Sequence, residues 1–136
     1  MTAAVRELLR SAVASLSHFV LFLEDDLRFN RHLRHNLVRW LEDWHAIPER
    51  HFFATLFNPS GASIGTKLNR TTFLDAKCAF GGQALLFSSS TARHLLDNWD
   101  RCEGLHDFRM SKLAALLGPI YCHSPSLVQH VSVPST

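Results

Sequence analysis

Apolar residues recur at helical spacing in one part of the chain and in short continuous runs in others. Between residues 3 and 16 they fall three or four positions apart, which predicts a helix with one buried face. The next stretch, "HFVLFLE" at 18–24, is almost entirely apolar, and such runs are typical of strands that are covered on both faces. Similar runs predict further strands at 51–57, 84–88 and 119–123.

Three more helices are predicted between these runs. Asn30 is placed to cap the first of them, and Ser89 or Ser90 to cap the second. The third lies near 107–117, where apolar residues again recur at helical spacing. The segment 58–70 contains one Pro and two Gly, so a loop is expected there. The alternation of strands and helices predicts an α/β fold, with a layered, mostly parallel sheet and flanking helices.

Composition narrows the class of protein. A hydrophobic fraction of 46% and a charged fraction of 19% are ordinary for a globular domain, and a net charge of +2 gives no reason to expect nucleic acid as a partner. No apolar stretch approaches the roughly 20 residues that cross a bilayer, so no membrane partner is expected. The three cysteines lack metal-site spacing and are expected to be reduced thiols, which favours a cytoplasmic location.

Three consecutive acids, Glu24, Asp25 and Asp26, follow the first predicted strand directly. In open parallel sheets, ligands bind outside the carboxyl ends of the strands. Alternation along an extended backbone would direct Glu24 and Asp26 to one side, where two carboxylates are costly without a cation. Oxygen ligands of this kind suit Mg²⁺ or Mn²⁺. The alternative is a solvated acidic turn, helped by the arginines that follow it.

Four segments, taken together, resemble the motifs of glycosyltransferases with the GT-A fold. "FLEDDLRF" (22–29) is similar to the DxD-type metal motif, and "FGGQALLFSSSTARHLLDNW" (80–99) to the glycine-containing acceptor-side segment. "GLHDFRM" (104–110) resembles the later acidic motif, and "PSLVQHVSVPS" (125–135) the stretch with a metal-binding histidine. Their order and approximate spacing agree as well. The likeness is greatest to the N-acetylglucosaminyltransferase IV group and its bacterial relatives.

The resemblance implies a metal site. Glu24 and Asp26 would bind Mn²⁺ or Mg²⁺ and the nucleotide-sugar donor, His130 would complete the site, and Asp25 would shape the turn on the donor side. The metal would stabilise the departing nucleoside diphosphate. An exposed histidine with no ligand is the alternative for His130.

The resemblance also implies an acceptor side. Gly81 and Gly82 would let the backbone approach the sugars, and Asp107 would be the general base that deprotonates the acceptor hydroxyl. His106 would lie on the substrate side next to Asp107. The alternatives are a tight turn for the glycine pair, a helix N-cap for Asp107 and a surface position for His106.

The chain departs from the family in its length. Only 23 residues precede Glu24, whereas enzymes with this fold bind the nucleotide chiefly with elements that precede the acidic motif. Residues 1–136 are therefore expected to form a single domain that corresponds to the acceptor and metal half of a GT-A fold. The missing half would belong to a longer chain, or come from a partner or a second copy in a homo-oligomer.

The leading hypothesis for function is a metal-dependent, inverting glycosyltransferase domain that uses a nucleotide-sugar donor and a glycan acceptor. The main alternative is a non-catalytic remnant that acts as a binding or assembly module. A metal-dependent hydrolase would also use clustered acids and histidines, but it leaves the glycine and C-terminal segments without a role.

Overall fold

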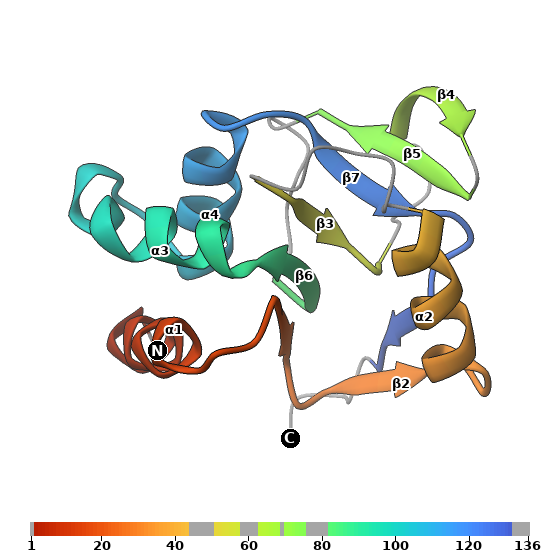
Figure 1. The fold of residues 1–136 in the computed structure, drawn as a ribbon, viewed down its shortest axis with the longest axis horizontal. Coiled ribbons are helices and arrows are strands. Elements are labelled where there is room, and N and C mark those ends of the chain that lie inside the picture. The colour runs from red at the N-terminus through yellow and green to blue at the C-terminus, as the bar shows by residue number, and fades with distance from the viewer. Residues whose placement is uncertain (1, 44–50, 58–62, 69, 76–81, 132–136) are drawn as a thin grey trace.

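Six strands form one mixed sheet, and two further strands form a separate ladder (Figure 1). The computed structural model describes residues 2–43, 51–57, 63–68, 70–75 and 82–131. Its elements in chain order are α1 (Thr2–Ala14), β1 (Phe19–Leu23), β2 (Leu27–Phe29), α2 (Leu33–Asp43), β3 (Phe53–Thr55), β4 (Ser63–Leu68), β5 (Thr71–Leu74), β6 (Ala84–Ser88), α3 (Ser89–Asp97), the short 3-10 helix η3 (Trp99–Arg101), α4 (His106–Ala115), β7 (Ile120–His123) and β8 (Val128–His130).

The large sheet has the order β1-β6-β3-β7-β5-β4. Of its five pairings, only that of β3 with β7 is parallel. The α/β class is confirmed, but the expectation of a mostly parallel sheet is wrong, because β6 lies between β1 and β3 and runs against both. The continuous apolar run of β6 is buried along its whole length although both of its pairings are antiparallel, so such a run does not report the direction of the neighbouring strands.

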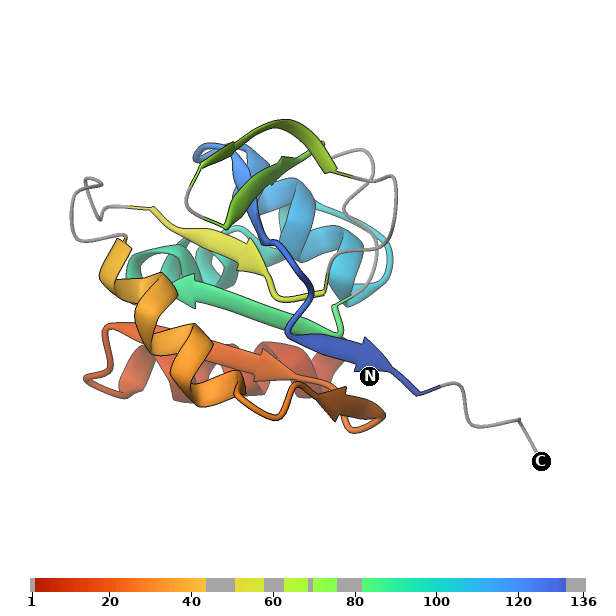
Figure 2. The ribbon, with the colours of Figure 1, turned by 90° about the vertical axis from the view of Figure 1, so that its right-hand side faces the viewer.

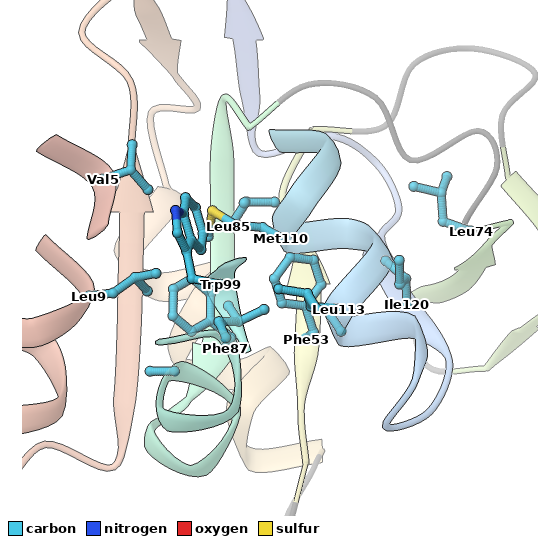
Figure 3. Close-up of a cluster of buried hydrophobic side chains, with 13 residues drawn as sticks. Val5, Leu9, Phe53, Leu74, Leu85, Phe87, Trp99, Met110, Leu113 and Ile120 are labelled. Carbon is cyan, nitrogen blue, oxygen red and sulfur yellow. The ribbon is translucent and has the colours of Figure 1, made fainter. Parts of the chain in front are cut away.

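Each face of the sheet has its own hydrophobic core. Helices α1, α3 and α4 cover one face, and their side chains pack with those of β3 and β6 in the cluster drawn in Figure 3. Helix α2 covers the other face (Figures 1 and 2). There Trp40 is fully buried among residues of β3, β6 and β8. Strand β6 serves both cores, since Leu85 and Phe87 belong to the first and Ala84 and Leu86 to the second.

Strand β1 lies at the edge of the sheet and not at its centre. Val20 and Phe22 pack against the first core, while Leu21 and Leu23 on the opposite face are 41% and 39% exposed. The expectation that this strand is covered on both faces is therefore wrong. Hydrophobicity alone did not distinguish an apolar edge strand from a central one.

Two other local predictions differ from the structure, one at the cap of α3 and one in the segment 58–70. Ser88, one residue before the expected positions, caps α3, and its Oγ accepts a hydrogen bond from the Thr91 N–H at 3.3 Å. Strand β4 lies within the segment 58–70, so the loop predicted there is wrong for 63–68, while 58–62 and 69 lie outside the described residues. Among the described residues, no helix has both the length and the apolar character needed to cross a membrane.

The imidazole of His123 is buried in the second core and is only 1% exposed. Its Nδ1 lies 2.6 Å from the Pro125 carbonyl oxygen and donates to it, and the ring meets that of Trp40 edge-on at 4.9 Å between centroids. Its Nε2 is buried and has no partner among the described residues. Burial, opposed by the hydrogen bond to Pro125 and aided by the charge of Arg70, lowers the pKa of His123.

This lowered pKa predicts acid sensitivity of the fold. The unfolded imidazole titrates near pH 6.5, so below that pH the unfolded chain binds more protons than the folded one. We expect His123 to contribute a loss of stability as the pH falls from about 6.5 towards the folded pKa, with a slope of at most about 1.4 kcal/mol per pH unit. Urea unfolding of the wild type, His123→Phe and the exposed control His35→Phe across this range measures it. A slope that persists in His123→Phe would contradict the assignment.

Candidate functional site

The antiparallel pair β2–β8 brings the C-terminal part of the described chain to the acidic triplet. Leu27 is opposite His130, and Phe29 is opposite Val128. The ladder continues beyond both strands, because the Val131 N–H donates to the Asp26 carbonyl at 2.9 Å and the Asn30 N–H to the Leu127 carbonyl at 2.8 Å. Residues from near the two ends of the sequence are thereby fixed side by side.

Asp26 and His130 form the first of two side-chain pairs at this site. Nε2 of His130 lies 2.6 Å from Oδ2 of Asp26, and both side chains are partly exposed. The second carboxylate oxygen of Asp26, Oδ1, is buried and has no hydrogen-bond partner among the described residues. A buried carboxylate oxygen without a donor is costly, so this atom is available to a positively charged or donating ligand.

Glu24 and His106 form the second pair. Glu24 directly follows β1, and its N–H donates to the Gln83 carbonyl at 2.9 Å, which continues the pairing with β6. His106 is the first residue of α4, and its Nε2 lies 3.3 Å from Oε1 of Glu24. His106 is only 8% exposed, and its ring lies tilted against that of Phe22. The interpretation of His106 as a surface residue is therefore wrong.

Gly82 lies where these elements meet. A Cβ at this position would lie 3.3 Å from the Cβ of Asp107, 3.3 Å from Nε2 of His106 and 3.5 Å from Oε1 of Glu24. The glycine therefore permits the start of α4 to approach the end of β1 closely. Gly81 lies outside the described residues.

Asp107 lies in the first turn of α4, but it is not the N-cap. The capping residue is Leu105, which makes no side-chain capping bond, so the N-cap interpretation of Asp107 is wrong. Oδ1 of Asp107 accepts the Phe108 N–H at 2.8 Å, which satisfies one of the amides that a first helical turn leaves unpaired. This bond holds the Asp107 carboxylate against the backbone at the start of α4, and the Cβ of Asp107, like Glu24 and His106, lies near Gly82.

Asp25 occupies the bend between β1 and β2 and is exposed. Its position between Glu24 and Asp26 agrees with the expected role in the turn, since the chain changes direction there. Alternation along an extended strand does not describe this bend, so Glu24 and Asp26 each have a different histidine as neighbour.

The residues at this site fit a divalent cation in part. Within the part of the chain that the structure describes, no group of three or more His, Cys, Asp or Glu side chains is arranged to hold a metal ion. Asp26 and His130 offer one carboxylate and one imidazole, with Oδ1 of Asp26 unpartnered among the described residues. Mg²⁺ and Mn²⁺ sites often use few protein ligands and retain waters, so two ligands suit such an ion. Glu24 as a further ligand stays a prediction.

Cys122 is not a candidate nucleophile. Cys102 and Cys122 are free thiols, as expected, and Cys78 lies outside the described residues. Cys122 is fully buried in β7, and burial, partly offset by a hydrogen bond with Thr72, raises the pKa of its thiol to about 11. That thiol is protonated at neutral pH and inert.

Comparison with models of protein families finds no match for this chain, and a search of curated proteins finds none. Any function proposed for the chain therefore rests on the geometry of these residues and on the resemblance of its four segments.

Proposed function

We propose that this chain is a metal-dependent, inverting glycosyltransferase domain that transfers a sugar from a nucleotide-sugar donor to a hydroxyl of a glycan. The observation that supports this most is the β2–β8 pairing, which sets the imidazole of His130 against the carboxylate of Asp26. These two residues come from the first and the last of the four segments that resemble the family. A metal site formed by Asp26 and His130 requires the last of the four segments to lie beside the first.

The two middle segments support the proposal through the second pair. Gly82 comes from one and His106 and Asp107 from the other, and both segments converge on Glu24. Glu24 and Asp26 are two residues apart, so their Cα atoms lie within about 7 Å of each other. All four segments therefore contribute residues to one small region at the end of β1.

Asp26 and His130 would hold Mn²⁺ or Mg²⁺, with Glu24 as a further ligand. When bound, the ion would supply Lewis-acid stabilisation of the charge that develops on the leaving diphosphate. His106 acts through Glu24: its Nε2–H donates to the carboxylate and fixes its orientation.

Asp107 would act as general base on the acceptor side. The acceptor oxygen forms a bond to the anomeric carbon, its proton passes to the Asp107 carboxylate, and the bond from that carbon to the diphosphate oxygen breaks. No second carboxylate is required as a covalent nucleophile, so the anomeric configuration inverts. The absence of a Cβ at Gly82 lets Asp107 and His106 approach the end of β1 closely.

A calorimetric titration with UDP, in the presence and absence of Mn²⁺, tests the proposal. We expect UDP to bind only when Mn²⁺ is present, because its phosphates would share the ion with Asp26 and His130. A folded protein that binds neither Mn²⁺ nor UDP would overturn the proposal.

The second candidate function, a non-catalytic binding or assembly module, is favoured by one observation. Leu21 and Leu23 leave apolar surface exposed at the edge strand β1, as a module that docks through this edge would require. Under either function we propose a cytoplasmic location and no nucleic-acid partner.

A further inference from the structure

The outer edge of β1 has no partner in the described part of the chain. In the order of the six-stranded sheet, β1 is the end strand and β6 is its one neighbour. The five residues Phe19–Leu23 pair with β6 without a register shift. These five residues include no charged residue and no proline. Charged residues and prolines usually keep an edge strand from pairing with another chain.

The hydrogen bonds to β6 show which backbone groups remain outward. The Ser89 N–H donates to the His18 carbonyl, and the Glu24 N–H donates to the Gln83 carbonyl. In an antiparallel ladder, alternate residues exchange bonds with one neighbour, so the even-numbered residues from His18 to Glu24 bond to β6. The N–H and C=O groups of the odd-numbered residues, Phe19, Leu21 and Leu23, therefore point away from the sheet.

We propose that a second copy of this chain pairs its β1 with this edge, antiparallel, about a two-fold axis at Leu21. This register sets Leu21 opposite Leu21 of the second copy and Phe19 opposite Leu23. The backbone N–H and C=O groups of Phe19, Leu21 and Leu23 all point away from the sheet. Each opposed pair therefore exchanges two hydrogen bonds, and every outward N–H and C=O of the strand is satisfied.

The side chains select the same register. Every apolar residue of one strand faces an apolar residue of the other, and the exposed side chains of Leu21 and Leu23 are covered by cross-strand neighbours. Beyond the strand ends, His18 lies opposite Glu24, so no two like charges meet. A shift of the axis by one residue towards the C-terminus sets Asp25 opposite Phe19, which leaves an acid against an apolar side chain.

Sedimentation equilibrium over a wide range of concentration tests the proposal. We expect the wild type to reach twice the 15.4 kDa of one chain, and Leu21→Lys to remain monomeric because it places like charges at the two-fold axis. Leu116→Lys, at an exposed leucine far from β1 in the sequence, is the matched control and should dimerise like the wild type. A wild type that is monomeric at every concentration, or a dimer that persists in Leu21→Lys, would overturn it.

A second variant covers the case in which Leu21→Lys fails to fold. Opposed residues of a hydrogen-bonded antiparallel pair have Cα atoms about 5.5 Å apart, within the range that a disulfide spans. Leu21→Cys should therefore form a covalent dimer on mild oxidation, while the wild type and Val38→Cys, exposed on α2, should not. Absence of the dimer in Leu21→Cys, or equal amounts in all three proteins, would overturn the two-fold pairing.

Discussion

Replacing Asp107 by asparagine is expected to lower the rate of sugar transfer by about 10²–10⁴-fold, the usual contribution of a general base. The amide oxygen of asparagine can still accept the Phe108 N–H, so the first turn of α4 is expected to keep its geometry. The substitution removes the proton acceptor and little else. Transfer from a labelled nucleotide sugar to an oligosaccharide, followed under single-turnover conditions, measures the change.

Asp97→Asn is the matched control, because it is the same substitution at an exposed aspartate at the end of α3. Its transfer rate should equal that of the wild type. Binding of UDP with Mn²⁺ should be the same in all three proteins, since Asp107 is not assigned to the donor. If Asp107→Asn transfers sugar at the wild-type rate, Asp107 is not the base, while the Asp26–His130 site would still stand.

The elements that could be predicted from sequence are those whose signal is local. The helical spacing at 3–16 corresponds to α1, although Leu16 lies beyond its end and is fully exposed. The continuous run at 84–88 corresponds to β6, and α4 ends before the glycine-proline stop. The resemblance places His130 at the same site as Asp26, and these two side chains lie 2.6 Å apart, while their role as metal ligands stays a prediction. A local pattern and the order of motifs can both be read from the sequence without knowledge of the tertiary structure.

What sequence could not supply depends on pairing between distant segments. Strands β2 and β8 have three residues each, too few for a period-two pattern to be recognised, and they are stabilised by each other. The edge position of β1 depends on which strand lies beside it, and its composition carries no sign of that. The burial of His106 cannot be read from its own segment for the same reason. It comes from contacts with Phe22 and Glu24, more than 80 positions earlier in the chain.

The two histidines of the site differ in burial and contact different acids of the same bend. His106 is buried and contacts Glu24 from the helix side of the sheet, whereas His130 is partly exposed and contacts Asp26 from the β2–β8 ladder. The buried His106 holds the Glu24 carboxylate in one orientation, while the more exposed Asp26–His130 pair can exchange one partner for a ligand. We therefore expect a bound ion to change the contact between Asp26 and His130 and to leave the contact between Glu24 and His106 in place.

Loss of either member of the exposed pair should abolish cation binding. We expect Asp26→Ala and His130→Ala each to weaken Mn²⁺ binding by at least about 100-fold, since even an outer-shell partner typically contributes 10–100-fold. The electron paramagnetic resonance signal of free Mn²⁺ measures this directly, because bound Mn²⁺ loses it. Asp97→Ala is the matched control, as the same change at an exposed aspartate at the end of α3, outside the site.

The expected pattern separates a metal site from a purely structural ion pair. If Asp26 and His130 only stabilise the β2–β8 ladder, both alanine variants will unfold at lower urea concentration, and the wild type will leave the Mn²⁺ signal unchanged. If the pair binds the ion, the wild type and Asp97→Ala will reduce the signal of free Mn²⁺ equally. Asp26→Ala and His130→Ala will leave that signal intact at concentrations where circular dichroism shows them folded. The unpartnered Oδ1 of Asp26 favours the second outcome, because a structural pair alone leaves that buried oxygen unsatisfied.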